Sequence, residues 1–181
     1  MRAANISLYA AHEALDRAAT DSVGAVLARR VDLTIEREGR FDLVVALAPP
    51  VAFEAWTALV AERLAAPVPA WPNAAHFRRV AVVPGGGGST EYLAKALALG
   101  CDTFLTGEGS LYTELFAREQ QLSLVFASHA ATEFPAVCTF VASVADALGL
   151  EWQAVHESEF ITGGGRAPIE RSSPLNSRDH R

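Results

Sequence analysis

Residues 79–90 read RVAVVPGGGGST, and this stretch decides the fold. The apolar run Val80–Val83 is typical of a buried strand, and the four glycines that follow it predict a turn. Ser89 is a favoured N-cap residue, so a helix should begin directly after the glycines, run to Leu99 and end at Gly100. A strand that leads through a short turn into a helix is the repeating unit of α/β proteins.

The alternation of strand and helix continues downstream of this stretch. Strands are predicted at Asp102–Leu105 and Leu122–Ala127, and a helix at Ser110–Gln120 should lie between them. A last helix carries apolar residues at helical spacing as far as Leu148, and Leu150–Val155 is predicted to form a final strand. The directions of the strands do not follow from these patterns.

The upstream half follows the same alternation less regularly. Its expected elements are a strand at Asn5–Ala11, a helix capped by Thr20 or Asp21, extended runs at Val31–Glu36 and Phe41–Leu47, and a helix that Pro49 and Pro50 open and that runs to Leu64. The whole succession predicts the α/β class, as a layered α/β sandwich in which strands and helices alternate. We expect one domain over residues 1–161 and a disordered tail over residues 162–181, which are rich in Gly, Pro, Ser and Arg.

Composition and charge argue against several classes of protein. Hydrophobic residues make up 50% of the 181-residue chain, which is enough for a packed core, and the net charge of −6 argues against a nucleic-acid partner. Cys101 and Cys138 lack CxxC spacing, which predicts two reduced thiols. We see no secretory leader pattern and expect no apolar run of membrane length, so the expected location is the cytoplasm.

Two pairs of His and acidic residues could carry chemistry. His129 and Glu133 lie four residues apart just after a predicted strand, and His12 and Asp16 have the same spacing after another. At this spacing on a helix, two side chains share a face and can converge on one ion. Imidazole and carboxylate ligands suit Zn, Mn, Fe or Co. A solvated helix start, with Glu133 favoured by the helix dipole, explains the same residues without a metal.

Two glycine-containing turns offer further candidate groups. Gly85–Gly88 joins a strand to a helix and could cradle a phosphate, but it lacks the Lys of a Walker A loop, so a tight structural turn is favoured. Glu108 lies between two glycines after another predicted strand. It could act as a base, position a water molecule or support a metal ligand, and a plain acidic residue at a helix start is the alternative.

Five stretches of the chain occur in the order and at the intervals of a known family. They are ISLYAAHEALD (6–16), RVAVVPGGGGS (79–89), DTFLTGEG (102–109), FASHAATE (126–133) and LGLEWQAV (148–155). Together they resemble the GTP cyclohydrolase 1 type 2 homologue family of dinuclear metal-centre hexameric proteins. The resemblance implies two metal ions in each subunit of a homohexamer and a metal-dependent hydrolase acting on a nucleotide-like substrate. It implies that Asp16, His129 and Glu133 are metal ligands and that His12 lies near the site. If a complete site forms, we expect Glu108 to transfer protons.

The chain also departs from that family's pattern. Family members carry a His-His pair upstream of the ISLYAAH-like strand, whereas here the chain begins at Met1, just before Ile6. The ligands that remain predict at most one weakly held ion per chain, and a fold that is incomplete relative to the family. Two other functions stay open: a non-catalytic oligomeric binding or scaffold module that needs no metal, and a nucleotide- or phosphate-binding protein that uses Gly85–Gly88.

Overall fold

The computed structural model describes residues 6–16, 18, 21–38 and 43–156. The chain divides into two compact units, Met1–Phe140 and Val141–Arg181. The first unit contains the sheet and the candidate site, and the second begins within the last helix. The predicted tail, residues 162–181, lies outside the described residues.

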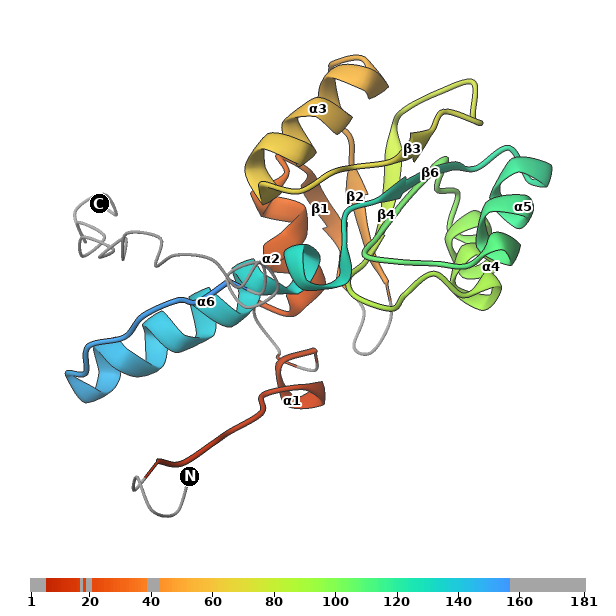
Figure 1. The fold of residues 1–181 in the computed structure, drawn as a ribbon. Helices are drawn as coiled ribbons and strands as arrows, with labels where there is room; N and C mark the ends of the chain where they lie inside the picture. Colours follow the sequence, from red (N-terminus) through yellow and green to blue (C-terminus); the bar gives the residue numbers. More distant parts are fainter. Residues whose placement is uncertain (1–5, 17, 19–20, 39–42, 157–181) are drawn as a thin grey trace. The chain divides into compact units, whose positions relative to one another are not determined.

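A six-stranded mixed sheet forms the centre of the first unit (Figure 1). Its strands are β1 (Thr34–Arg37), β2 (Val44–Leu47), β3 (Ala70–Trp71), β4 (Arg79–Val83), β5 (Thr103–Thr106) and β6 (Ser123–Phe126). They are arranged in the order β1-β2-β4-β5-β6-β3. β4, β5 and β6 pair in parallel, and the other neighbours pair antiparallel. The three parallel strands therefore bring their carboxyl ends together at one end of the sheet, where α/β proteins bind ligands.

The helices are α1 (Glu13–Asp16), α2 (Val23–Arg30), α3 (Phe53–Leu64), α4 (Thr90–Ala98), α5 (Leu111–Glu119) and α6 (His129–Leu148). Buried side chains of α2, α3 and the start of α6 share one core cluster with the sheet, and those of α4 and α5 share the other. Alternate residues of β4 divide between them, because Val80 and Val82 belong to the first cluster and Ala81 to the second. The predicted layered α/β fold is confirmed.

The stretch from which the fold was predicted forms the expected elements. Arg79–Val83 is a central strand, and Ser89 caps α4 by accepting a hydrogen bond from the Tyr92 amide at 3.3 Å. α4 ends at Ala98, and Gly100 follows with a φ of 74°, a conformation that glycine adopts without strain. The strands and the helix predicted between residues 102 and 127 are also confirmed.

Two predicted strands are absent from the part of the chain that the structure describes. Residues 6–11 form no strand, and the side chains of Ile6, Leu8 and Tyr9 are 61%, 79% and 74% exposed. Leu150–Val155 is likewise not a strand. Alternating polarity shows that a segment suits a pleated surface, but a strand also needs a neighbouring backbone to share its hydrogen bonds. The short strand β3, in a proline-rich connector, carries no such pattern and was not predicted.

The N-cap of α2 also differs from the prediction. Ser22 is the cap, and its side chain accepts a hydrogen bond from the Ala25 amide at 3.3 Å. Asp21 instead has a φ of 59° and forms an ion pair with Arg29 at 2.5 Å. The sequence offers several adjacent capping residues, and the tertiary fold selects one of them.

The last helix is longer and more apolar than expected. By length and composition α6 could cross a membrane, and 22% of an apolar stretch of 18 residues within it is buried inside the protein. One such helix is weak evidence of a membrane span, and the expectation that the chain has none stays a prediction. The first turn of α6 is nevertheless attached to the sheet, because the Gly85 amide donates a hydrogen bond to Thr132 Oγ1 at 2.9 Å. The cytoplasmic location stays a prediction.

Trp56→Phe is expected to lower the free energy of unfolding by about 1–3 kcal/mol. Trp56 is 1% exposed, and its indole Nε1 donates a hydrogen bond to the Val31 carbonyl at 2.9 Å. The substitution removes buried volume and leaves that carbonyl without its donor. Urea unfolding measures the change, and Trp71→Phe on the half-buried strand β3 is the matched control. An equal loss in both variants would contradict the assigned role of the hydrogen bond.

Candidate functional site

Three loops meet at the carboxyl end of the parallel strands. The glycine run Gly85–Gly88 follows β4, Gly107 and Glu108 follow β5, and His129 begins α6 shortly after β6. Gly88 and Gly109 form a parallel bridge that extends the pairing of β4 and β5 beyond the strands themselves. The parallel register therefore brings together residues that are far apart in the sequence.

His129 contacts a carboxylate on each side of its ring. We call His129, Glu108 and Glu133 the His129 cluster. Its Nδ1 lies 2.8 Å from Glu108 Oε1, and its Nε2 lies 3.2 Å from Glu133 Oε1. The exposed fractions of these side chains are 48% for His129, 60% for Glu108 and 35% for Glu133. The hydrogen bond that His129 Nδ1 donates to the Glu108 carboxylate raises the pKa of His129, burial opposes this, and the charge of Glu133 raises the pKa further.

Gly85 provides the space in which Glu133 and His129 approach each other. It has a φ of 61°, and a Cβ there would overlap Glu133 Oε1 and lie 3.0 Å from His129 Nε2. Its amide donates to Thr132 Oγ1 at 2.9 Å, and its carbonyl accepts from the Glu108 amide at 3.0 Å. The Gly85 amide is therefore engaged within the protein, which favours the structural-turn interpretation of this residue over a phosphate cradle.

A cavity of about 560 Å³ opens beside this cluster. Its lining includes all four predicted metal-site residues: His12, Asp16, His129 and Glu133. Val44, Val82 and Val83 supply apolar walls, and Tyr92 of α4 adds a phenol. Among the described residues, no group of three or more His, Cys, Asp and Glu side chains is close enough to hold a metal ion. The structure thus brings His129, Glu133 and Glu108 into contact and places His12 and Asp16 on the wall of the same cavity.

The sequence pattern predicts no role for Thr132, although this residue lies within the FASHAATE stretch. Its side chain is buried, and its Oγ1 accepts a hydrogen bond from the Gly85 amide, which lies in a loop 47 residues away in the sequence. A threonine four residues after Ser128 is a weak local signal, because threonine commonly bonds to the backbone of the preceding helical turn. Its partner in the glycine run follows only from the tertiary structure.

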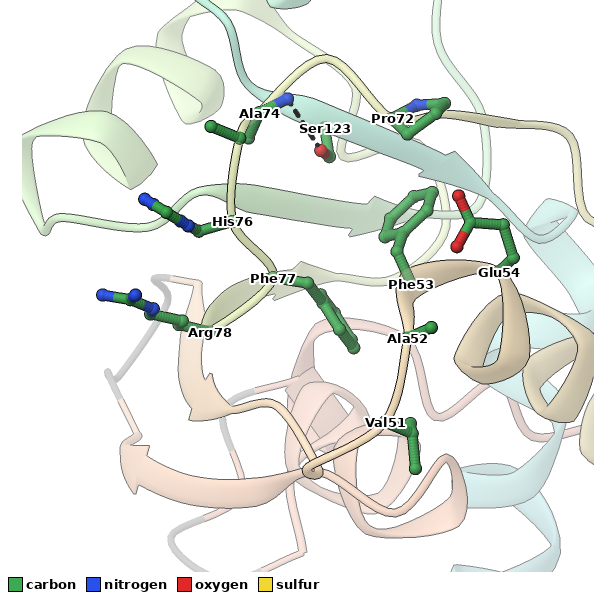
Figure 2. A pocket seen from close by; sticks show the side chains of 11 residues that line it. Val51, Ala52, Phe53, Glu54, Pro72, Ala74, His76, Phe77, Arg78 and Ser123 are labelled. Atoms are coloured by element: carbon green, nitrogen blue, oxygen red, sulfur yellow. Dashed lines mark hydrogen bonds between the residues drawn. The ribbon is translucent and has the colours of Figure 1, made fainter.

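A second cavity, of about 370 Å³, lies at the opposite end of the strands, near the starts of β4 and β6. Figure 2 shows Phe53 and Phe77 close together within it, with the side chains of His76 and Arg78 directed to one side. The two phenyl rings form an edge-to-face pair with centroids 5.6 Å apart. Phe53 belongs to the first core cluster, and Phe77 packs against that cluster. His76 is exposed, as expected for a surface residue, and lies away from the His129 cluster.

The comparisons with known proteins agree on one family. The sequence model of the Duf34/NIF3 (NGG1p interacting factor 3) family matches residues 1–162. The chain is 35% identical over 153 residues to a GTP cyclohydrolase 1 type 2 homolog from Allochromatium vinosum. That alignment covers 81% of this chain and 59% of the relative, so the chain spans less than two thirds of that protein's length.

Solved structures show the same partial overlap. The protein ybgI, of unknown function, superposes with a TM-score of 0.68 and 28% identity, covering 78% of this chain and 59% of that one. TTHA1606 from Thermus thermophilus has a TM-score of 0.64 and 25% identity, covering 81% and 59% respectively. Reduced HcgD from Methanocaldococcus jannaschii, at 22% identity and a TM-score of 0.67, shares the fold and covers 80% and 58%.

Proposed function

The chain belongs to the Duf34/NIF3 (NGG1p interacting factor 3) family, and from this premise we propose that it holds a divalent metal ion at the carboxyl end of its parallel strands. One observation carries the proposal. His129 Nε2 and Glu133 Oε1 lie 3.2 Å apart, above a glycine whose missing side chain leaves room for both. The name of the relative from Allochromatium vinosum suggests hydrolysis of a nucleotide-like substrate as the reaction.

The spacing of these two atoms suits a shared ion. Ligands about 2.1 Å from a tetrahedral metal lie roughly 3.4 Å apart, close to the observed separation. The other ring nitrogen of His129 lies 2.8 Å from Glu108 Oε1, and such a carboxylate orients the imidazole in metal sites. The donor set of one imidazole and one carboxylate fits Zn, Mn, Fe or Co.

His129 and Glu133 supply one adjacent pair of donors, which is the basis for a single ion. Among the described residues, no third His, Cys, Asp or Glu joins this pair in a group that could hold a metal ion, because Glu108 contacts the other ring nitrogen of His129. Asp16 and His12 line the same cavity and are the nearest candidates to complete the shell. We therefore propose one ion per chain, held mainly by His129 and Glu133, with the dinuclear centre of the family only partly supplied by this chain.

Each residue of the cluster has a distinct part in this proposal. A bound divalent ion would polarise a substrate oxygen and lower the pKa of water. His129 and Glu133 would hold the ion, and Glu108 would fix the imidazole so that Nε2 faces Glu133. The Glu108 carboxylate is hydrogen-bonded to His129 Nδ1, so we assign this orienting role to it first. Glu108 would transfer a proton only after that hydrogen bond breaks. The described lining of the cavity includes no Lys or Arg, so side-chain charge does not favour a phosphate-rich substrate there.

A scaffold function is the second candidate, and it is favoured because the described residues contain no group of three donors that could hold a metal ion. A subunit that has lost part of the metal site could persist as a non-catalytic oligomeric binding module. Such a module would fold and assemble equally well in a chelator, whereas a metal-holding subunit would be stabilised by the ion. Metal content therefore distinguishes the two candidates.

The purified chain is expected to bind at most one transition-metal ion per subunit. Elemental analysis after dialysis against Zn²⁺ or Mn²⁺ measures the ratio of metal to protein. A value near one supports the proposal, and its disappearance in His129→Ala would locate the ion. Two tightly held ions per chain would contradict the single-ion site, and none at millimolar metal would favour the scaffold.

We also propose that the chain forms a homo-oligomer, with the hexamer of the family as the expected size. Large apolar side chains, Leu111 and Tyr112 of α5 and Val137 of α6, are exposed in the single chain. Light scattering coupled to size exclusion should give a mass of about six times the 19.3 kDa of one chain. A concentration-independent mass equal to one chain would contradict assembly.

A further inference from the structure

Thr132 connects the first turn of α6 to the glycine run. Its side chain is buried, and Oγ1 accepts a hydrogen bond from the Gly85 amide at 2.9 Å. The same hydroxyl lies 2.9 Å from the carbonyl oxygens of Ser128 and His129, and it can donate its one proton to either. One side chain thus bonds at the same time to its own helix start and to a loop from another strand.

The Gly85 peptide is held from its other side as well. Its carbonyl accepts the Glu108 amide at 3.0 Å and faces Thr106 Oγ1 at 3.4 Å. A Cβ on Gly107 would meet the Gly85 carbonyl oxygen at 2.6 Å and Thr132 Oγ1 at 2.8 Å, so the three segments have no spare room. The loops after β4 and β5 and the start of α6 therefore meet at one peptide, and they carry all three members of the His129 cluster.

From this junction we infer that Thr132 is a positioning residue for the metal site. Thr132 is adjacent to Glu133 in the sequence and lies within one helical turn of His129, so its bond to Gly85 sets the rotation and height of that turn. This places Glu133 Oε1 and His129 Nε2 together above the Gly85 Cα. The inference rests on the proposed function, since the positioned atoms are the proposed ligands.

The competing explanation is that Thr132 only satisfies a buried amide. Both explanations predict that Thr132→Val, which keeps the shape and removes the hydroxyl, destabilises the protein. They differ in what happens to the ligand atoms. A positioning role predicts weaker metal binding beyond the general loss of stability, with recovery in Thr132→Ser, which restores Oγ.

Titration of the folded, metal-free chain with Co²⁺, followed by its visible absorption, tests the inference. Thr132→Val should raise the Co²⁺ dissociation constant by roughly 10–100-fold and alter the absorption band, as loss of supporting residues does in other sites. Thr132→Ser should bind as wild type does. Thr103→Val is the matched control, because Thr103 is equally buried but bonds to Asp102 at the other end of β5.

Unchanged Co²⁺ binding by Thr132→Val would overturn the inference and leave the proposed metal site standing. Equal weakening in Thr103→Val, or failure of Thr132→Ser to recover binding, would also overturn it. Absence of Co²⁺ binding by wild type would overturn the proposed site and the positioning role together. Should Thr132→Val not fold, Thr132→Ala takes its place, and misfolding of both would show a role in the fold rather than in the site.

Discussion

Gly107→Ala is expected to lower the melting temperature by about 6–12 °C. A methyl group there would meet the Gly85 carbonyl oxygen at 2.6 Å, the His129 Cα at 2.8 Å and Thr132 Oγ1 at 2.8 Å. Two of these neighbours are backbone atoms, and the third is a hydroxyl held by hydrogen bonds, so the backbone itself must move. Overpacking of this kind costs about 3 kcal/mol, and each kcal/mol lowers the melting temperature of a chain of this size by about 2–4 °C.

Gly86→Ala is the matched control for this prediction. A Cβ at Gly86 would have Glu108 Oε1 at 3.6 Å and His129 Cε1 at 3.8 Å as its nearest neighbours, which is ordinary contact. The substitution should leave the melting temperature within a few degrees of wild type, because it also reduces the freedom of the unfolded chain. Equal melting temperatures for Gly107→Ala and wild type would show that the three loops do not meet as closely as described.

The second large effect is the response of thermal stability to metal. Excess Zn²⁺ or Mn²⁺ is expected to raise the melting temperature of wild type by about 5–10 °C. A ligand at about 100 times its dissociation constant stabilises the folded state by about 2.7 kcal/mol, and that energy corresponds to such a shift in a chain of this size. His129→Ala and Glu133→Ala should lose most of the response, because each removes one of the two adjacent donors.

The same variants compared in a chelator separate metal binding from folding. Glu133 and His129 are partly exposed, so the ion pair between them contributes only about 0–1 kcal/mol without metal. Both variants should therefore melt near wild type in the chelator and differ only when metal is added. His76→Ala, at the opposite end of the strands, should keep the full response. An equal metal response in all four proteins would refute the assignment of the ligands.

Much of the fold could be predicted from local patterns in the sequence. The apolar run of β4 predicts a strand, the glycines predict a turn, and the Ser89 cap predicts the start of a helix. These signals are readable in the sequence because burial periodicity, glycine conformation and capping each act within a few residues. The spacing of His129 and Glu133 predicts that they share a helix face, and the two side chains do lie together. The spacing could not reveal that Glu108, which is 21 residues upstream, contacts the other ring nitrogen.

The N-terminal segment shows where local patterns stop being sufficient. Residues 6–11 have the alternation of a strand, yet the described structure gives them no strand partner, and the side chains of Ile6, Leu8 and Tyr9 are exposed. A strand is defined by hydrogen bonds to a neighbour, and no pattern within one segment contains information about that neighbour.

The sequence by itself therefore determined the alternation of elements, the α/β class and the identity of the candidate ligands. Only the tertiary structure decided the sheet order, the meeting of three loops at Gly85, and the link between Thr132 and a residue 47 positions away. The physical reason is range: propensity, periodicity and capping act over one turn or one strand, whereas strand pairing and close backbone approach depend on segments brought together by packing of the whole core.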